Sequence, residues 1–215
     1  MKSYFILGTD TDCGKTYVTC QLLRALQAEN QNVVALKPVA SGCSEQNGVL
    51  ISEDAACLAK YMDRTQDEIC PWRLRLPISP HLAAQADGQS ISAQMIVDFC
   101  TDPSFETLDY LLIEGAGGLM VPLNEQETWV DVLIQSKIQV ILVVGMRLGC
   151  INHALLTALA LKIHNIPCAG WIANCIDNDM LAVSENINTL SNKMDWPLLA
   201  ILPFAEEPPI SSVTI

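Results

Sequence analysis

The residues with the clearest chemical potential lie near the start of the chain, in the segment GTDTDCGKT at 8–16. An apolar run precedes this segment and an amphipathic run follows it, which predicts a strand, a glycine-bounded loop and a helix. The backbone N–H groups of such a loop and the positive end of the helix attract polyphosphate. Lys15 would reach the β- and γ-phosphates of a nucleotide, and the Thr16 hydroxyl would bind Mg²⁺. We call 8–16 the phosphate loop.

The glycine spacing of the phosphate loop differs from the common motif. Five residues separate Gly8 from Gly14, whereas the G-x-x-x-x-G-K-[ST] pattern has four. An incidental strand-to-helix turn would need neither the apolar strand before the loop nor the amphipathic helix after it, so the context favours nucleotide binding. Cys13 within the loop is predicted to be a packing residue, because a position near a helix start is by itself weak evidence for a reactive thiol.

Three further candidates lie beside other predicted elements. Lys37 follows the apolar run at 33–36, and Glu114 follows the run at 110–113 and precedes three glycines. Ligands collect at the carboxyl ends of parallel strands, and an acidic residue after an apolar strand is the usual partner of Mg²⁺ in P-loop enzymes. Asp54 follows a helix-start serine, so it would either cap that helix or turn towards Mg²⁺.

Composition restricts the class of protein. The chain has 215 residues, half of them hydrophobic, and a formal net charge of −12. This predicts a folded protein with a large core, and the negative charge argues against nucleic acid or an anionic membrane as the main partner. The nine cysteines are odd in number and form no C-x-x-C pair, and no export signal or membrane-spanning run is evident. We therefore expect reduced thiols in a cytoplasmic protein.

Apolar runs and amphipathic segments alternate along the chain. This order predicts a P-loop NTPase-like α/β fold, with a doubly wound, mainly parallel sheet flanked by helices, in a single domain spanning 1–215. The expected strands lie at 4–7, 33–36, 110–113, 140–144, 169–173 and 198–201. The expected helices lie at 18–26, 53–61, 92–100, 130–136, 150–164 and 181–193.

Two regions lack such a pattern. Residues 41–52 combine two glycines with several polar residues and are expected to form a loop over the site. Residues 64–89 contain three prolines, which predicts irregular structure with short helices. In the helix at 150–164, the apolar stripe is expected to pack into the core. That stripe includes Leu155, Leu156, Leu159 and Ile163.

Together, five motifs resemble those of a known family, the ATP-dependent dethiobiotin synthases of biotin biosynthesis. They are GTDT with GKT in the phosphate loop, KPVASG at 37–42, EGAGG at 114–118, GCINH at 149–153 and GWIAN at 170–174. They cover nearly the whole chain, and the wide glycine spacing of the phosphate loop is a feature of that family. The resemblance implies a homodimeric enzyme that closes the ureido ring of dethiobiotin from 7,8-diaminononanoate, CO₂ (or bicarbonate) and MgATP. A carbamate and a carbamic-phosphoric anhydride would be intermediates, and ADP and phosphate would be products.

The resemblance also implies roles for individual residues. The catalytic groups would be Thr11, Lys15 and Lys37. The two lysines would supply pre-placed cations, which stabilise charge that grows on a transferring phosphoryl group. Mg²⁺ would be held by Thr16, Asp54 and Glu114. The nucleotide would contact Asp12, Cys13, Gly14, Lys15, Thr16, Tyr17, Asp54, Glu114, Gly115, Ala116, Gly117, Asn174, Cys175, Pro203, Phe204 and Ala205. The diamine-derived substrate would contact Ser41, Gly117, Gly118, Cys150, Ile151 and Asn152.

Two of these sets have a more specific role in the family pattern. Asn152 and its neighbouring amides would receive the substrate carboxylate across the dimer interface, at a helix N-terminus suited to an anion. Asn174 would read the edge of the adenine, because a side-chain amide donates and accepts at once. Pro203, Phe204 and Ala205 would line the base pocket.

Two alternatives predict different chemistry. A P-loop amide-forming enzyme, such as a cobyrinate-amidating domain, needs an ammonia source, for which the chain has no room. An ATP-switched positioning protein of the partition or septum-site type would carry an extra lysine early in the phosphate loop, and often a membrane-binding or DNA-binding surface. The sequence shows neither feature. A requirement for diamine and bicarbonate in ATP consumption, rather than for a partner protein, would distinguish the synthase from this switch.

Overall fold

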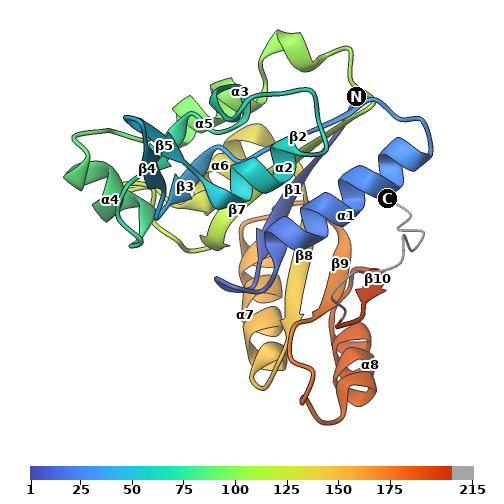
Figure 1. Ribbon diagram of the computed structural model, residues 1–215. Helices are drawn as coiled ribbons and strands as arrows, with labels where there is room; N and C mark the ends of the chain where they lie inside the picture. Colours follow the sequence, from blue (N-terminus) through green and yellow to red (C-terminus); the bar gives the residue numbers. More distant parts are fainter. Residues whose placement is uncertain (205–215) are drawn as a thin grey trace.

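The protein, described by a computed structural model over residues 1–204, is built on a six-stranded sheet. The strand order is β10-β9-β8-β1-β7-β2 (Figure 1), and every neighbouring pair is parallel. Apolar residues run continuously through the strand interiors, as in sheets that are covered on both faces. The predicted doubly wound, parallel architecture is confirmed. The strands are β1 (Lys2–Gly8), β2 (Val33–Leu36), β7 (Tyr110–Gly118), β8 (Gln139–Met146), β9 (Cys168–Cys175) and β10 (Leu198–Leu202).

Helices cover both faces of this sheet. α1 (Lys15–Ala28) lies on one face, and α6 (Trp129–Ser136) and α7 (Cys150–Ile163) lie on the other (Figure 1). The chain adds β7 and β2 on one side of β1 and β8 to β10 on the other, so the direction of strand addition reverses at β1. Ligands of open α/β sheets bind at such a reversal, beyond the carboxyl ends of the strands. Three further helices are α2 (Glu53–Ala59), α5 (Ala93–Cys100) and α8 (Val183–Lys193).

The segment 41–52 contains strands, so the prediction of a loop there is wrong. An antiparallel hairpin turns at Asn47 and Gly48, whose φ angles are 52° and 80°. Asn-Gly is a favoured sequence for such turns, but the flanking strands have only three residues each and are too short to show an alternating pattern. A second small sheet joins Val39–Ser41 to Trp72–Leu74. These strands are β3 (Val39–Ser41), β4 (Ser44–Gln46), β5 (Val49–Ile51) and β6 (Trp72–Leu74).

Two other stretches refine the sequence prediction. The short helices expected within 64–89 are present as α3 (Gln66–Ile69) and α4 (Pro80–Ala86), and a short 3₁₀ turn, η1, follows at Pro103–Phe105. β7 continues to Gly118, so Glu114 lies inside this strand and not after it. Among the described residues, no helix is both long and apolar enough to span a membrane.

Three of the four residues predicted for the core-packing stripe of α7 face away from the core, and only Leu155 packs against it, which corrects most of the prediction from the sequence. Leu156, Leu159 and Ile163 are 58%, 54% and 66% exposed, and Leu155 is half-buried. The buried side of α7 is formed by Cys150, Ala154, Ala158 and Leu161. Small alanines allow the helix to lie close to the sheet, and the bulky residues then face outward.

Candidate functional site

The phosphate loop connects the end of β1 to the start of α1 in a conformation that requires glycine at position 14. Gly14 has a φ of 82°, and a Cβ atom there would lie 2.1 Å from Nδ2 of Asn174. That Nδ2 donates a hydrogen bond to the carbonyl of Cys13 at 3.0 Å. The loop is therefore held against the end of β9 by a buried side-chain amide, and no residue with a side chain fits at position 14.

Lys15 and Thr16, the last two residues of the phosphate loop, begin the first turn of α1. Lys15 is buried, and its Nζ donates to the carbonyl of Asp10 at 3.0 Å. The Thr16 Oγ1 lies 2.6 Å from Glu114 Oε1 and 2.9 Å from Asp54 Oδ1. A hydroxyl has one proton and donates to one carboxylate at a time. These three oxygens therefore form a cluster that favours a cation.

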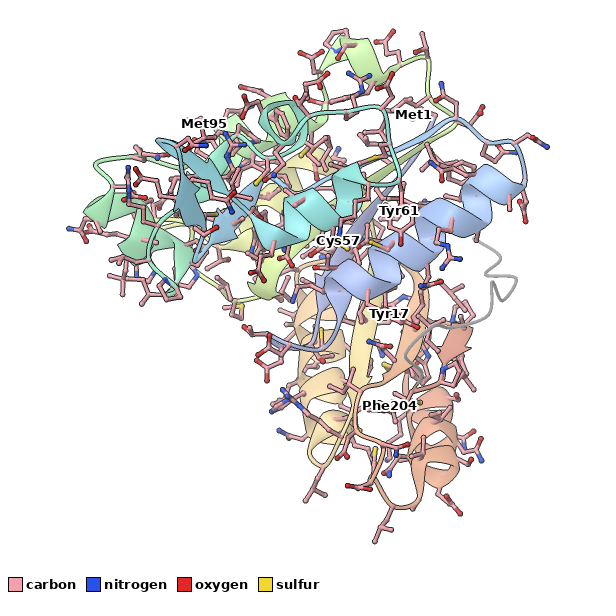
Figure 2. The ribbon with its side chains drawn as sticks, in the orientation of Figure 1. Met1, Tyr17, Cys57, Tyr61, Met95 and Phe204 are labelled. Carbon is pink, nitrogen blue, oxygen red and sulfur yellow. The ribbon has the colours of Figure 1, made fainter. Side chains whose placement is uncertain are left out.

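Asp54 reaches this cluster from α2. Ser52 caps α2 by accepting a hydrogen bond from the N–H of Ala55 at 3.2 Å, so Asp54 is not the cap of this helix and its carboxylate lies beside Thr16 instead. α2 packs on α1, and Figure 2 shows Cys57 on α2. The sulfur of Cys57 lies 3.6 Å from that of Cys20 on α1. None of the nine cysteines, all within the described part of the chain, forms a disulfide.

Lys37 completes the cluster from just beyond the end of β2. Its Nζ lies 2.6 Å from Glu114 Oε1 and 2.8 Å from Asp54 Oδ2, and it donates to the carbonyl of Gly115 at 3.2 Å. Burial alone lowers the pKa of Lys37, but the neighbouring carboxylates outweigh burial and hold this pKa above its ordinary value. Burial likewise raises the pKa of Asp54, but the charge of Lys37 and the hydrogen bonds to it hold that pKa below its ordinary value.

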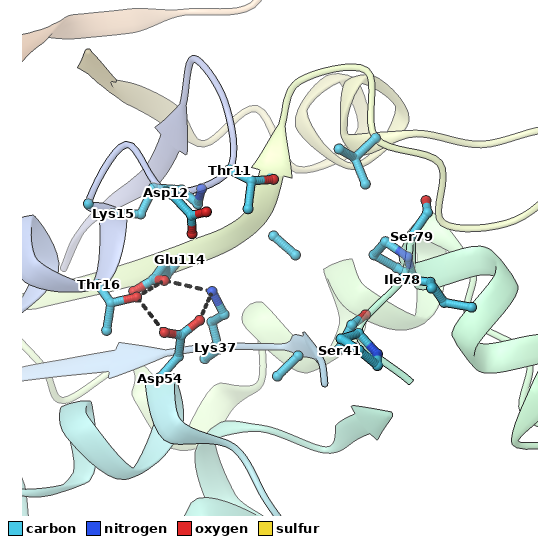
Figure 3. Close-up of a pocket in the computed structure, with 17 residues that line it drawn as sticks. Thr11, Asp12, Lys15, Thr16, Lys37, Ser41, Asp54, Ile78, Ser79 and Glu114 are labelled. Atoms are coloured by element: carbon cyan, nitrogen blue, oxygen red, sulfur yellow. Dashed lines mark hydrogen bonds and ion pairs between the residues drawn. The ribbon is translucent and has the colours of Figure 1, made fainter. Parts of the chain in front are cut away.

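These groups line one end of a cleft of about 690 Å³. Figure 3 shows Thr16, Lys37, Asp54 and Glu114 joined at this end, with Ser41, Ile78 and Ser79 across the cavity. The hydroxyl of Ser41 is buried and has no hydrogen-bond partner within residues 1–204. The remaining lining comes from the phosphate loop and from small or apolar residues. These are Thr11, Asp12, Gly14, Lys15, Ala40, Pro77, Pro80, Ala116, Gly117 and Val121.

The oxygen cluster fits a magnesium ion that is shared with a nucleotide. Glu114 is fully buried, and its Oε2 has no hydrogen-bond partner in the described residues. A buried carboxylate oxygen left in this state is costly unless it meets a cation. The same residues contain no group of three or more His, Cys, Asp or Glu side chains that could hold a metal. Mg²⁺ usually keeps several waters and takes phosphate oxygens, so two carboxylates and one hydroxyl suit it.

Other residues predicted from the sequence lie apart from this cleft. Cys150 and Ile151 line a second cavity of about 340 Å³, next to Arg147 and Asn186, and Asn152 is exposed. Phe204, one of the residues predicted to line the adenine pocket, is half-exposed (Figure 2). The main cleft is not lined by Cys13, Tyr17, Gly115, Gly118, Asn174, Cys175, Pro203 or Phe204. Ala205 lies outside the described residues.

Sequence reasoning missed the cleft wall formed by residues 77–80. The wall is fixed by tertiary contacts, because the N–H of Gly42 donates to the carbonyl of Leu76 at 3.0 Å. A proline-rich segment gives no periodic signal that would place it beside Ser41. The only local hint was the helix-start sequence Ser79-Pro80.

Comparison with known proteins identifies the family. A family model described as an AAA domain matches residues 2–208. The ATP-dependent dethiobiotin synthetase BioD of Legionella pneumophila (strain Paris) is 54% identical over 200 residues, which cover 93% of this chain and 92% of that protein. The chain belongs to the ATP-dependent dethiobiotin synthetase family. A second family member, from Nitrosospira multiformis, is 45% identical over 203 residues, with coverage of 94% and 88%.

Solved structures similar to this dethiobiotin synthetase family member show the P-loop fold. The septum site-determining protein MinD of Pyrococcus horikoshii, complexed with Mg-ADP, has a TM-score of 0.57 at 19% identity and covers 94% of this chain and 81% of its own. The signal recognition particle receptor FtsY of Elizabethkingia anophelis has a TM-score of 0.61 at 14% identity, with coverage of 100% and 61%. At such low identities the likeness concerns the fold alone, and it does not favour the ATP-switch alternative.

Proposed function

We propose that this protein is an ATP-dependent cyclo-ligase that forms dethiobiotin from 7,8-diaminononanoate, CO₂ and ATP, releasing ADP and phosphate. The observation that carries the proposal is a single cleft, which joins the phosphate loop to Lys37 and Ser41. Such a cleft suits a phosphoryl group that passes from a nucleotide to a small acceptor. The relatives named above carry the same activity in their names. One domain, 1–215, would contain all the residues required.

The nucleotide phosphates would lie on the N–H groups of the phosphate loop. Lys15 would leave the carbonyl of Asp10 and donate to the β- and γ-phosphates. Mg²⁺, held by Thr16, Asp54 and Glu114, would neutralise part of the phosphate charge. The amide of Asn174 already bonds the loop, so its proposed contact with adenine would use its remaining acceptor and donor capacity.

Lys37 would stabilise negative charge and would not act as a base. Its raised pKa keeps the ammonium protonated at neutral pH, and its Nζ lies at the cleft end shared with Thr16. One amine of the diamine adds to CO₂ and loses a proton to give the carbamate. A carbamate oxygen attacks the γ-phosphorus and ADP leaves; Lys37 and Lys15 neutralise the growing charge.

Ring closure follows in the same cleft. The second amine attacks the carbonyl carbon of the mixed anhydride, the C–O bond to phosphate breaks, and the amine proton is lost. Thr11, Ser41 and the backbone at Gly117 and Gly118 would hold the carbamate and the reacting amine. The free hydroxyl of Ser41 supports this assignment, because it is buried beside the cleft and its hydrogen-bonding capacity is unused within the described chain.

We also infer a homodimer and a cytoplasmic location. The outward apolar stripe of Leu156, Leu159 and Ile163 supports a dimer in which a second copy of the chain covers α7. In such a dimer, Cys150, Ile151 and Asn152 of one copy would lie at the carboxylate end of the substrate bound to the other copy. Nine unbridged thiols support a reducing compartment.

One experiment tests the proposed reaction. Purified protein is incubated with 7,8-diaminononanoate, ¹³C-bicarbonate and MgATP, and the products are analysed by mass spectrometry. We expect a cyclic urea that carries one ¹³C atom and one ADP released per ring. ATP hydrolysis that proceeds equally well without the diamine, with no labelled urea, would contradict the proposal and favour a switch.

A further inference from the structure

Asp10, within the phosphate loop, pairs with Arg147, which lies just after β8, a strand next to β1. Its Oδ2 accepts a hydrogen bond from Nη2 of Arg147 at 2.6 Å, and its Oδ1 accepts one from the N–H of Thr11 at 2.8 Å. Nδ1 of His153 lies 3.9 Å from the same Oδ2. Arg147 lies in the turn between β8 and α7. The ion pair therefore ties the first half of the loop to an element far away in the sequence.

Two of the side-chain contacts that hold the loop differ in kind. Asn174, which is buried, bonds the carbonyl of Cys13 in the second half of the loop. Arg147 and Asp10 pair in the first half, and their side chains are 37% and 43% exposed. The charged contact is thus on the solvent side, where its strength depends on ionic strength.

Asp10 also lies beside the lysine that would bind the phosphates. Lys15 Nζ donates to the carbonyl of Asp10. If the carboxylate of Asp10 lost its partner, it would attract Lys15 away from the phosphates and would repel the nucleotide, since like charges disfavour each other at short range. Arg147 neutralises this carboxylate and at the same time fixes its direction towards the N–H of Thr11.

We propose that Arg147 is a positioning residue for the nucleotide phosphates. By pairing with Asp10, it fixes the first half of the phosphate loop and removes a negative charge that would compete for Lys15. The inference rests on the nucleotide site of the proposed function, and it is independent of the identity of the second substrate.

The test measures nucleotide affinity directly. Binding of Mg-AMP-PNP, a non-hydrolysable ATP analogue, is followed by calorimetry for the wild type, Arg147→Gln and Arg147→Lys, and the KM for ATP is measured alongside. We expect Arg147→Gln to weaken binding by about fivefold, the upper end of what a partly exposed ion pair contributes. The KM for ATP should rise in parallel, and Arg147→Lys should retain most of the affinity because it keeps the charge. Arg64→Gln is the matched control, because Arg64 pairs with Glu68 on the surface.

A double variant separates charge from general structural damage. Asp10→Asn combined with Arg147→Gln removes both charges, so it should bind the analogue more tightly than Arg147→Gln alone, and the defect of Arg147→Gln should shrink at high salt. Unchanged affinity in Arg147→Gln, or a double variant no better than this single one, would overturn the proposal. A wild type that binds the analogue yet forms no cyclic urea would contradict the proposed reaction and leave this inference standing.

Discussion

Lys37 and Glu114 carry opposite charges in a part of the protein that is almost without solvent, at 3% and 0% exposure. Burying such a pair is weak evidence for stability, because desolvation offsets the attraction. Removing one partner is a different matter, since the other charge is then left buried and uncompensated. At the scale of residues, the site is thus maintained by mutual neutralisation, and each member should affect both folding and turnover.

Lys37→Gln should lower kcat by about 100-fold or more, the loss expected when one pre-placed group that stabilises transition-state charge is removed. It should also lower the free energy of unfolding by about 3 kcal/mol, because two carboxylates lose their cation. The kcat should be measured well below the unfolding temperature, with folding checked by circular dichroism. Lys60→Gln, at the exposed end of α2, is the control. A folded Lys37→Gln variant with near-normal turnover would remove Lys37 from the mechanism.

Glu114→Gln should raise the Mg²⁺ concentration for half-maximal activity by about tenfold or more, judged from the losses seen even for residues that only support metal ligands. The substitution keeps the shape of the side chain and removes its charge. Activity is measured against free Mg²⁺ at fixed ATP. An unchanged Mg²⁺ dependence would show that Glu114 does not hold the ion.

The residues that follow local patterns were predictable from the sequence, and those brought in by packing were not. Thr16 belongs to a motif, and Glu114 belongs to an apolar run that ends in glycines, so both could be placed at one sheet edge. Arg147 and Ile78 follow no such pattern. Their places depend on which strand lies beside β1 and on how the 77–80 segment folds back onto β3.

At the scale of elements, short α2 decides where Asp54 points. Ser52 satisfies the first turn of this helix, and its own N–H donates to Gln66 Oε1 at 3.0 Å. Ser52 is buried, so water cannot replace it easily. The helix start is thus fixed from both sides, which holds the Asp54 carboxylate near Thr16.

Ser52→Ala should destabilise the protein by about 1 kcal/mol, the usual effect of losing a helix cap. It should also raise the Mg²⁺ requirement, because the start of α2 becomes less well fixed. Urea unfolding gives the first quantity and activity against free Mg²⁺ gives the second. Ser92→Ala, which removes the equivalent cap of α5, should lower stability only. Equal Mg²⁺ requirements in the two variants would show that the cap of α2 does not affect the metal site.

Element types were largely predictable from periodicity, but the surface that an element faces was not. The pattern of α7 identified an apolar stripe correctly, yet the sheet contacts the alanine side, Ala154 and Ala158. Periodicity shows that a helix has an apolar side without showing what covers that side. The hairpin at Asn47 and Gly48 was missed for another reason, since its strands are too short to alternate visibly.

At the scale of the whole molecule, the outward stripe of α7 and its neighbouring cavity should determine the state of assembly. Leu159→Glu should convert the proposed dimer to a monomer, because it would place a charge in the proposed apolar contact. Sedimentation velocity measures this directly. The KM for the diamine should rise while Mg-AMP-PNP still binds. Ile134→Glu, at an exposed position on α6, is the control. A wild type that is fully active as a monomer would contradict the dimer.

The position of β1 has a consequence for how the protein is made. β1 pairs only with β7 and β8 in the described chain, and β7 begins at Tyr110. A growing polypeptide on the ribosome therefore carries the complete phosphate loop long before either neighbouring strand has been translated. Such distant pairings slow folding and leave strand edges open to aggregation in the meantime. A nascent chain that stops short of Tyr110 should be unable to retain ATP, although every residue of its phosphate loop is already present.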